Sequence, residues 1–274
     1  MSLVLDHVVI LVTDLEAAID DYVALGFMVQ RGGTHADGAT HNALVGFADG
    51  SYLELIAFLR PAPDHRWWRH AQRGHEGFID FALLPASVEA VIEDARSRGL
   101  AYQGPHEGGR VRLDGQRLVW QTGTPPTPEL PFLCGDVTPR ALRVVEGDVR
   151  VHANGTQGVA CLSVLVADLD TSLARYAALL GAQPAPGARA VAMPGLGLRQ
   201  ATLELGPTLL VLAEPGPDAK DSTTLRDMLA GRGQGVLGLA LRGPAAAAPR
   251  ALARQRTHGA ALEIVADTNS HSIA

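Results

Sequence analysis

Residues 5–15 read LDHVVILVTDL, an apolar run with one histidine near its start and a polar pair near its end. Side chains alternate between the two faces of a strand, so His7 shares its face with Val9 and Leu11. Thr13 or Asp14 is a typical cap for the helix that follows. The stretch therefore predicts a strand that leads directly into a helix, with a histidine on an otherwise apolar face.

The predicted helix repeats along the chain. Residues 15–27 form an amphipathic pattern that ends at Gly26. Its expected apolar stripe consists of Leu15, Ile19, Tyr22 and Val23. An ungapped offset of 73 residues, from 15 to 88, brings the pattern back at residues 88–100, and residues 77–84 match the first strand. Such self-similarity indicates a repeat architecture.

Two further copies follow the first two. Residues 159–169 and a helix up to Gly181 form the third copy. The fourth is fainter, with strands at 236–241 and 262–265 and a helix expected over 245–256. In the first three copies three strand-like runs follow the helix: 27–31, 41–47 and 51–58; 101–103, 109–113 and 117–121; 190–192, 198–204 and 208–213. Each copy therefore reads as a βαβββ module of an α+β protein.

Composition excludes several classes of protein. The chain has 274 residues, 47% of them apolar, and a net charge of -6. An acidic chain disfavours a nucleic-acid or anionic-membrane partner, and no apolar run is long enough to span a bilayer. The two cysteines, Cys134 and Cys161, match no zinc spacing. We expect a reducing, cytoplasmic location.

Short motifs place these modules in a family. Leu5-Asp6-His7 is followed by residues 52–56, YLELI, then by the pair Trp67-Trp68 and by residues 130–132, LPF. In order and spacing the chain resembles the glyoxalase-like members of the vicinal oxygen chelate superfamily, which includes glyoxalase I, extradiol dioxygenases and drug-resistance binding proteins. The resemblance covers most of the chain.

The resemblance implies an architecture of two half-open barrels, each made of two modules. The first glyoxalase-like domain is expected over 1–140, with modules at 1–60 and 75–135, and a linker over 141–157. The second, over 158–274, is degenerate and short at its C-terminal side. There Cys161 and Leu210 stand at the two ligand positions, so no metal is expected. Its exposed strands suggest a homodimer.

In the superfamily a metal lies inside the barrel, held from the first and fourth strands of each module. The resemblance gives His7 and Glu54 in module one and, by the ungapped offset, Asp80 in module two. Aligning Gly115 on Gly50 puts Val119 at the fourth position. One histidine and two carboxylates suit Fe²⁺, Mn²⁺, Zn²⁺ or Ni²⁺, with positions left open for substrate.

A physical argument supports the same site. Glu54 shares its strand face with Tyr52, Ile56 and Phe58, and a carboxylate there costs several kcal/mol unless it is paired. A divalent cation would remove the repulsion between Glu54 and Asp80. Alternatively, Glu54 pairs with an arginine or accepts backbone N–H bonds. Asp80 could lie at the wet end of its strand or share a proton with Glu54.

Further residues are candidates for substrate binding. The loop expected over 32–42 could place His41 and Asn42 at the rim of the barrel, with Tyr52 and Trp120 as walls. Three arginines could bind an anionic group or be solvated at the surface: Arg110, Arg112 and Arg117.

Three functions follow. The first is a metal-dependent enzyme acting on a small molecule with two adjacent oxygens, by isomerase or lyase chemistry, with Glu54 moving the proton. The second is a metal-free protein that binds or sequesters a small molecule. The third is an extradiol-type dioxygenase.

Overall fold

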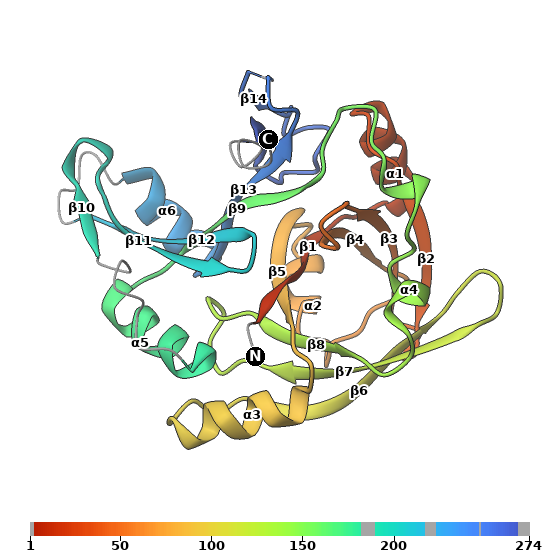
Figure 1. Cartoon of the computed structure of the whole chain (residues 1–274), viewed down its shortest axis with the longest axis horizontal. Coiled ribbons are helices and arrows are strands. Elements are labelled where there is room, and N and C mark those ends of the chain that lie inside the picture. The colour runs from red at the N-terminus through yellow and green to blue at the C-terminus, as the bar shows by residue number, and fades with distance from the viewer. Residues whose placement is uncertain (1–2, 182–189, 217–222, 247, 268–274) are drawn as a thin grey trace, which may run out of the picture.

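The computed structural model describes residues 3–181, 190–216, 223–246 and 248–267. The first half of the chain forms a closed barrel with the strand order β1-β4-β3-β2-β6-β7-β8-β5 (Figure 1). Its first module consists of β1 (Val4–Leu11), α1 (Leu15–Ala24), β2 (Gln30–His35), β3 (Thr40–Gly46) and β4 (Tyr52–Phe58). After α2 (Trp68–Ala71), its second consists of β5 (Gly77–Leu84), α3 (Val88–Ser97), β6 (Gln103–Val111), β7 (Arg117–Thr124) and β8 (Phe132–Asp136).

The second half forms a seven-stranded sheet in the order β10-β11-β12-β9-β13-β15-β14. The segment between the two sheets contains α4 (Arg140–Arg143) and a 3₁₀ turn, Asp148–Arg150. The elements that follow are β9 (Gly158–Leu165), α5 (Leu169–Leu180), β10 (Val191–Met193), a 3₁₀ turn (Pro194–Leu196), β11 (Leu198–Leu205), β12 (Thr208–Pro215), α6 (Thr223–Arg232), β13 (Gly235–Gly243), β14 (Arg250–Ala251) and β15 (Leu262–Ala266).

The predicted α+β fold of paired βαβββ modules is confirmed, with a difference in closure. The first barrel is closed rather than half-open, because β2 and β6 are hydrogen-bonded through two residue pairs, Thr34 with Val111 and His35 with Arg110. The second half stays an open sheet. Within the described residues no helix is long and apolar enough to cross a membrane.

The 73-residue offset corresponds to a pseudo-two-fold axis between β1 and β5. These strands are antiparallel, with His7 opposite Ala82 and Val9 opposite Asp80. Adding 73 to 7 and 9 gives 80 and 82, so the offset converts one pair into the other. His7 and Asp80 therefore occupy equivalent positions, as the sequence predicts.

The predicted equivalent of Glu54 in module two is wrong. Val9 pairs with Glu54 on β4, and its equivalent, Ala82, pairs with Phe132 on β8. Phe132 therefore takes the place assigned to Val119. The turn at Gly50 joins the third and fourth strands of its module, whereas the turn at Gly115 joins the second and third. Aligning the two turns therefore assigns β6 and β7 to the third and fourth strand positions of the module, although they are its second and third strands.

Two predictions for the second half also need correction. Ser163, the equivalent of Val9, pairs with Val211, so the position assigned to Leu210 belongs to Val211. The helix expected over 245–256 is absent from its described residues, which form turns and β14; residue 247 lies outside them. Pro249 accounts for this, because a proline inside a helix removes a hydrogen bond and clashes with the preceding turn.

Alternate side chains of β1 point to opposite faces of the strand, and this determines which of them enter the barrel. Val8, Ile10 and Val12 belong to the main core, while Val9 and Leu11 join a second cluster inside the barrel. Asp14 caps α1, and its Oδ1 accepts hydrogen bonds from Glu16 N at 2.9 Å and Ala17 N at 3.1 Å. Leu15, Ile19 and Tyr22 are buried as expected, but Val23 is 53% exposed because its neighbour Tyr22 takes the core face.

The two halves share one core. The main cluster contains residues of both sheets, from Leu3 to Ile264. Two buried tyrosines join the halves: Tyr22 donates to the Thr257 carbonyl at 3.4 Å, and Tyr176 to the Glu129 carbonyl at 2.7 Å. The second sheet thus covers the outside of the barrel and leaves its interior free.

Candidate active site

The barrel encloses a cavity of about 300 Å³. Aromatic side chains from both modules form much of its wall, and ionisable side chains lie among them. The aromatic residues are Tyr52, Trp67, Trp120 and Phe132. The ionisable ones include His7, His35, Glu54, Arg66 and Arg110. A pocket of this size and mixed lining is typical of a small-molecule site.

Glu54 is the central acid of this cavity, and its side chain is 6% exposed. Asn42 Nδ2 donates a hydrogen bond to its Oε1 at 2.6 Å. His7 Nε2 lies 3.4 Å from Oε2, and His35 Nε2 lies 3.6 Å from Oε1. The register explains the grouping, because Glu54 on β4 is adjacent to β1 on one side and β3 on the other.

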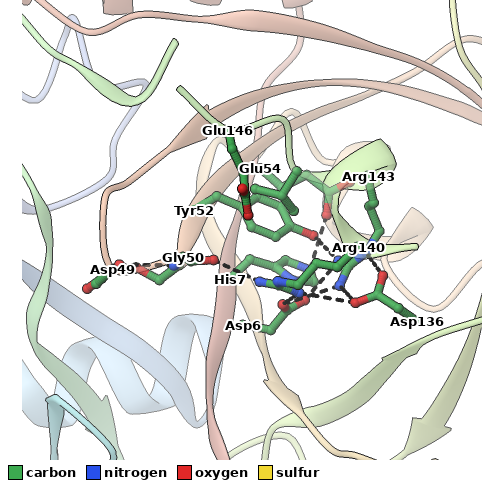
Figure 2. Close-up of polar contacts among 12 residues, drawn as sticks. Asp6, His7, Asp49, Gly50, Tyr52, Glu54, Asp136, Arg140, Arg143 and Glu146 are labelled. Carbon is green, nitrogen blue, oxygen red and sulfur yellow. Dashed lines mark hydrogen bonds and ion pairs between the residues drawn. The ribbon is translucent and has the colours of Figure 1, made fainter. Parts of the chain in front are cut away.

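His7 is held between two carboxylates (Figure 2). Its Nδ1 donates to Asp6 Oδ2 at 2.7 Å, and its ring stacks on Tyr52 with 4.5 Å between centroids. The bond at Nδ1 orients Nε2 towards Glu54. Such a carboxylate–histidine pair fixes both the tautomer and the ring position.

Asp6 is in turn anchored by α4. Arg143 Nη1 lies 2.9 Å from Asp6 Oδ2 and donates to the Tyr52 hydroxyl at 2.6 Å. Arg140 Nη1 lies 2.5 Å from Asp6 Oδ1. Asp136 forms an ion pair with Arg143, so two carboxylates balance the charges of the two arginines. Figure 2 shows the two arginines converging on Asp6. The predicted linker thus supplies buried contacts to the site.

The charges in this group push the pKa values of its members apart. Burial alone raises the pKa of Glu54, but the hydrogen bond and positive charge of His7, with His35 and Asn42, bring it down to about 2. Burial lowers the pKa of His7, and the hydrogen bonds to Asp6 and Glu54 outweigh that effect and raise it. Burial lowers the pKa of His35. These shifts favour the ionised form of Glu54 and the protonated form of His7.

Asp80 is buried on β5 but has different partners. Arg66 forms an ion pair with its Oδ2, Trp67 Nε1 donates to the same oxygen at 3.0 Å, and the Phe81 N–H donates to Oδ1 at 2.9 Å. Burial is the largest effect on the pKa of Asp80 and raises it despite Arg66. Asp80 is therefore neutralised by protein groups of its own.

These residues do not form the ligand set that the superfamily implies. Among the described residues there is no group of three histidine, cysteine, aspartate or glutamate side chains placed to hold a metal ion. Phe132 stands at the fourth ligand position, with its ring 5.3 Å from that of His7. The guanidinium of Arg66 lies 5.2 Å from the same ring. An aromatic ring and a cation thus occupy the part of the cavity where a divalent ion needs donors.

The structure brings together most, but not all, of the residues predicted from sequence. His7, Asn42, Tyr52, Glu54 and Trp120 line the cavity. Asp80 lies behind Arg66 and Trp67 and is not in contact with Glu54. His41 is not in the lining, because Asn42 points inwards and its neighbour on the strand points outwards.

Sequence reasoning did not find Asp6, His35, Arg66 and Arg143. His35 lies on β2, in a stretch read as a loop because of its glycines. In the structure Gly33 is part of the same strand, two residues before His35. Its φ of +130° requires glycine, and an added Cβ would lie 2.1 Å from the Val111 carbonyl oxygen. A glycine in this stretch is therefore compatible with a strand, which would have placed His35 on it. Arg66 and Arg143 lie in connecting segments that carry no periodic pattern.

The comparisons with known proteins agree with this fold. Residues 5–180 match the description of a glyoxalase-like domain. No curated protein matches the chain significantly. A hypothetical protein from Staphylococcus aureus has a similar structure, with a TM-score of 0.70, 13% identity and coverage of 96% of this chain and 99% of that one.

A second solved structure has a similar fold. A mutant of 4-hydroxymandelate synthase from Streptomyces coelicolor has a TM-score of 0.60 and 17% identity, with coverage of 89% of this chain and 72% of that one. At this identity the likeness concerns the fold. The family match extends over well over half of the 274 residues. The chain therefore belongs to the glyoxalase-like domain family.

Proposed function

We propose that this protein is a small-molecule enzyme that moves a proton at a carbon next to a carbonyl group, in an isomerase or lyase reaction. The observation that carries the proposal is the Glu54 carboxylate, which is buried in the wall of the cavity and held between His7 and Asn42. Glu54 is the base, and His7 is the acid that faces the substrate oxygen. A cavity with a positioned base and acid is what such proton transfer requires.

The pKa values support this division of roles. Groups whose surroundings push their pKa values apart serve as the acid and the base of one reaction. His7 is the main cause of the low pKa of Glu54, which is about 2. A substrate carbonyl oxygen that accepts the Nε2–H of His7 takes that hydrogen bond away from Glu54. Binding therefore raises the basicity of Glu54 at the moment when the base is needed.

His7 and Asn42 also stabilise the negative charge that forms on the substrate. Both present N–H donors on the two sides of Glu54. Because Asp6 fixes His7 and Arg143 fixes Asp6, the donor is already oriented before the substrate arrives. Donors that are oriented in advance stabilise the developing charge without having to reorganise during the reaction.

The metal-dependent form of this activity stays a prediction. Fe²⁺, Mn²⁺, Zn²⁺ or Ni²⁺ would find His7 and Glu54, while Asp80 is held by Arg66 and the fourth position is Phe132. No step proposed here passes through a metal. Extradiol-type dioxygenation needs iron in a set of three protein ligands, and this donor set does not support it.

Proton exchange tests the proposal. Wild-type protein is incubated in D₂O with 2-oxo acids and 2-hydroxy ketones, and loss of the α C–H signal is followed by NMR. Glu54→Gln keeps the shape of the side chain and is expected to slow the exchange by about 10²- to 10⁴-fold. Glu107→Gln is the matched control, because Glu107 is an exposed acid in the lining of the same cavity. Exchange at the wild-type rate in Glu54→Gln would contradict the proposal.

A second candidate is a metal-free binding protein. Phe132, at a position where the superfamily places a ligand, joins Trp67 to form an apolar wall. That wall favours tight binding of a flat molecule even without chemistry. Ligand binding that survives Glu54→Gln, together with the absence of exchange in every substrate tried, would favour this candidate.

A further inference from the structure

Arg110 is a buried cation in the cavity wall that the proton-transfer scheme does not use. It lies on β6 and is 4% exposed. Its Nη2 donates to the Arg143 carbonyl at 2.7 Å, and its Nη1 lies 3.5 Å from Asn42 Oδ1. Its Nε is buried and has no hydrogen-bond partner. All its contacts are therefore to neutral oxygens.

The other cations that line the cavity each face a carboxylate. Arg66 pairs with Asp80, Arg143 pairs with Asp6 and Asp136, and His7 faces Glu54. Within the described part of the chain, no carboxylate lies within 4.0 Å of the Arg110 guanidinium. Burying a charge without a partner is strongly unfavourable, so such a group marks a place where an anion binds.

Glu54 does not fill this role. Asn42 separates the two groups, with Nδ2 bonded to Glu54 and Oδ1 facing Arg110. Glu54 is already opposed by His7, whose pKa is raised by Asp6 and Glu54. Burial lowers the pKa of Arg110, and Arg143 and Arg112 act in the same direction, although the charges of Tyr52 and Glu54 raise it. The positive charge of Arg110 is therefore only partly compensated by the groups around it.

Trp120 supplies an apolar surface beside this charge. An added Cβ at Gly108 would lie 2.3 Å from Trp120 Nε1, so the indole rests directly on β6, two residues before Arg110. Trp67 and Phe132 also line the cavity and pack edge to face, with ring centroids 6.2 Å apart. The cavity thus offers aromatic walls next to a guanidinium.

We propose that Arg110 binds the carboxylate of an anionic substrate whose flat, apolar body lies against Trp120 and Phe132. A carboxylate matches the two N–H directions of a guanidinium, and the cavity of about 300 Å³ suits a one- or two-ring acid. This inference adds a substrate class to the proposed function. It rests on that function only because it assumes that the substrate binds in the cavity. It also orients the substrate, with its carboxylate at Arg110 and its reacting carbon near Glu54.

Matched acid–amide pairs test the inference. Benzoate and benzamide, and 2-naphthoate and 2-naphthamide, are titrated against the wild-type protein by tryptophan fluorescence and calorimetry. Trp67 and Trp120 line the cavity and report its occupation. We expect each carboxylate to bind at least about 10-fold more tightly than its amide, as for a charge-assisted hydrogen bond. Equal affinities, or no binding of either acid, would overturn the inference.

Two variants locate the effect. Arg110→Met removes the charge and keeps the length of the side chain, and it is expected to weaken carboxylate binding by about 10- to 100-fold without weakening amide binding. Arg112→Met is the control, because Arg112 bonds the Leu142 carbonyl outside the cavity lining. Unchanged carboxylate affinity in Arg110→Met would overturn the inference. If circular dichroism shows that this variant is unfolded, the acid–amide comparison in the wild-type protein decides.

Glu54→Gln keeps this test separate from that of the proposed function. If the wild-type protein shows no exchange activity but carboxylates bind both to it and to Glu54→Gln, the anion site is supported and the enzyme proposal fails. Exchange that depends on Glu54 but shows no preference for anionic substrates supports the enzyme and removes the anion site.

Discussion

Asp6 determines the protonation of His7, and this can be tested at a single residue. The Asp6 carboxylate accepts the Nδ1–H of His7 at 2.7 Å and is fully buried. Asp6→Asn removes the negative charge, so the pKa of His7 is expected to fall. The measurement is the pH dependence of the His7 ring nitrogen shifts by NMR. Asp136→Asn is the control, because Asp136 shares Arg140 and Arg143 with Asp6 but does not contact His7.

The sign of the resulting stability change follows from linkage. The pKa of His7 is raised above the ordinary value of 6.5, so its contribution to folding is fully present below 6.5 and is lost as the pH rises through the folded-state value. Asp6→Asn should reduce that loss. An unchanged His7 titration in the variant would contradict the assigned role of Asp6.

Glu54 gives the opposite dependence at acid pH. Its folded-state pKa of about 2 lies below the ordinary value of 4.5. Its stabilising contribution, ~3 kcal/mol for a shift of this size, is present above 4.5 and is lost as the pH falls towards 2. Urea unfolding of the wild-type protein and of Glu54→Gln should therefore converge as the pH falls. A constant difference between the two would show that Glu54 is not perturbed.

At this scale the sequence identified the strand residues and missed their partners. His7, Glu54 and Asn42 were predictable because each lies on a strand with a readable period and face. Asp80 was predicted to need a cation, and it has one, but that cation is Arg66 from an irregular segment. Arg143 could not be placed, because a contact with Asp6 across 137 residues of sequence leaves no local pattern. Arg66 lies only 14 residues before Asp80, but its segment has no periodic pattern that would give its direction.

The short helix α4 supplies the arginines that hold Asp6. Arg143 is 3% exposed and bonds Asp6, Asp136 and Tyr52. Arg143→Met should destabilise the protein by about 3 kcal/mol or more, because it leaves buried carboxylates without their main partner. Urea denaturation measures the change. Arg112→Met, which removes a half-buried cation, should cost much less.

A double mutant identifies the source of that cost. With Asp6→Asn already present, Arg143→Met should cost clearly less than it does alone, because one of the stranded charges is gone. Strict additivity of the two changes would mean that the Asp6–Arg143 pair contributes nothing to folding.

The sequence predicted where strands occur better than it predicted which position each strand takes in its module. The runs 109–113 and 117–121 were found, but β8 was not recognised as the fourth strand of its module, so Val119 was named where Phe132 lies. Hairpin turns look alike in sequence whichever strands they join. Only the pairing of β8 with β5, a contact between distant segments, distinguishes the two alignments.

The two halves of the molecule should unfold together. They share the main hydrophobic cluster, and Arg175 of α5 pairs with the fully buried Glu129 of the first half at 2.6 Å. All three tryptophans lie in the first half: Trp67, Trp68 and Trp120. Fluorescence therefore reports the barrel, and far-UV circular dichroism reports the whole chain. Coincident urea transitions are expected, and separated transitions would mean that the halves fold independently.

The repeat made the overall fold accessible from sequence. Four copies of one pattern, the last of them fainter, predicted paired modules, and the 73-residue offset between the first two matched the pseudo-two-fold axis. Barrel closure was not predictable, because only two residue pairs join β2 to β6. The domain limits, the homodimer and the cytoplasmic location stay predictions, to be measured by proteolysis, sedimentation and fractionation.

The central claim is that His7 and Arg66, rather than a divalent cation, balance the charges of Glu54 and Asp80, while Asn42 donates a hydrogen bond to Glu54. Calorimetric titration of chelator-washed protein with Zn²⁺, Mn²⁺, Fe²⁺ and Ni²⁺, beside His7→Ala, tests it most directly. The account predicts the same weak or absent uptake in both proteins. Tight binding of one ion per chain that is lost in His7→Ala would contradict it and restore the chelate site that the superfamily implies.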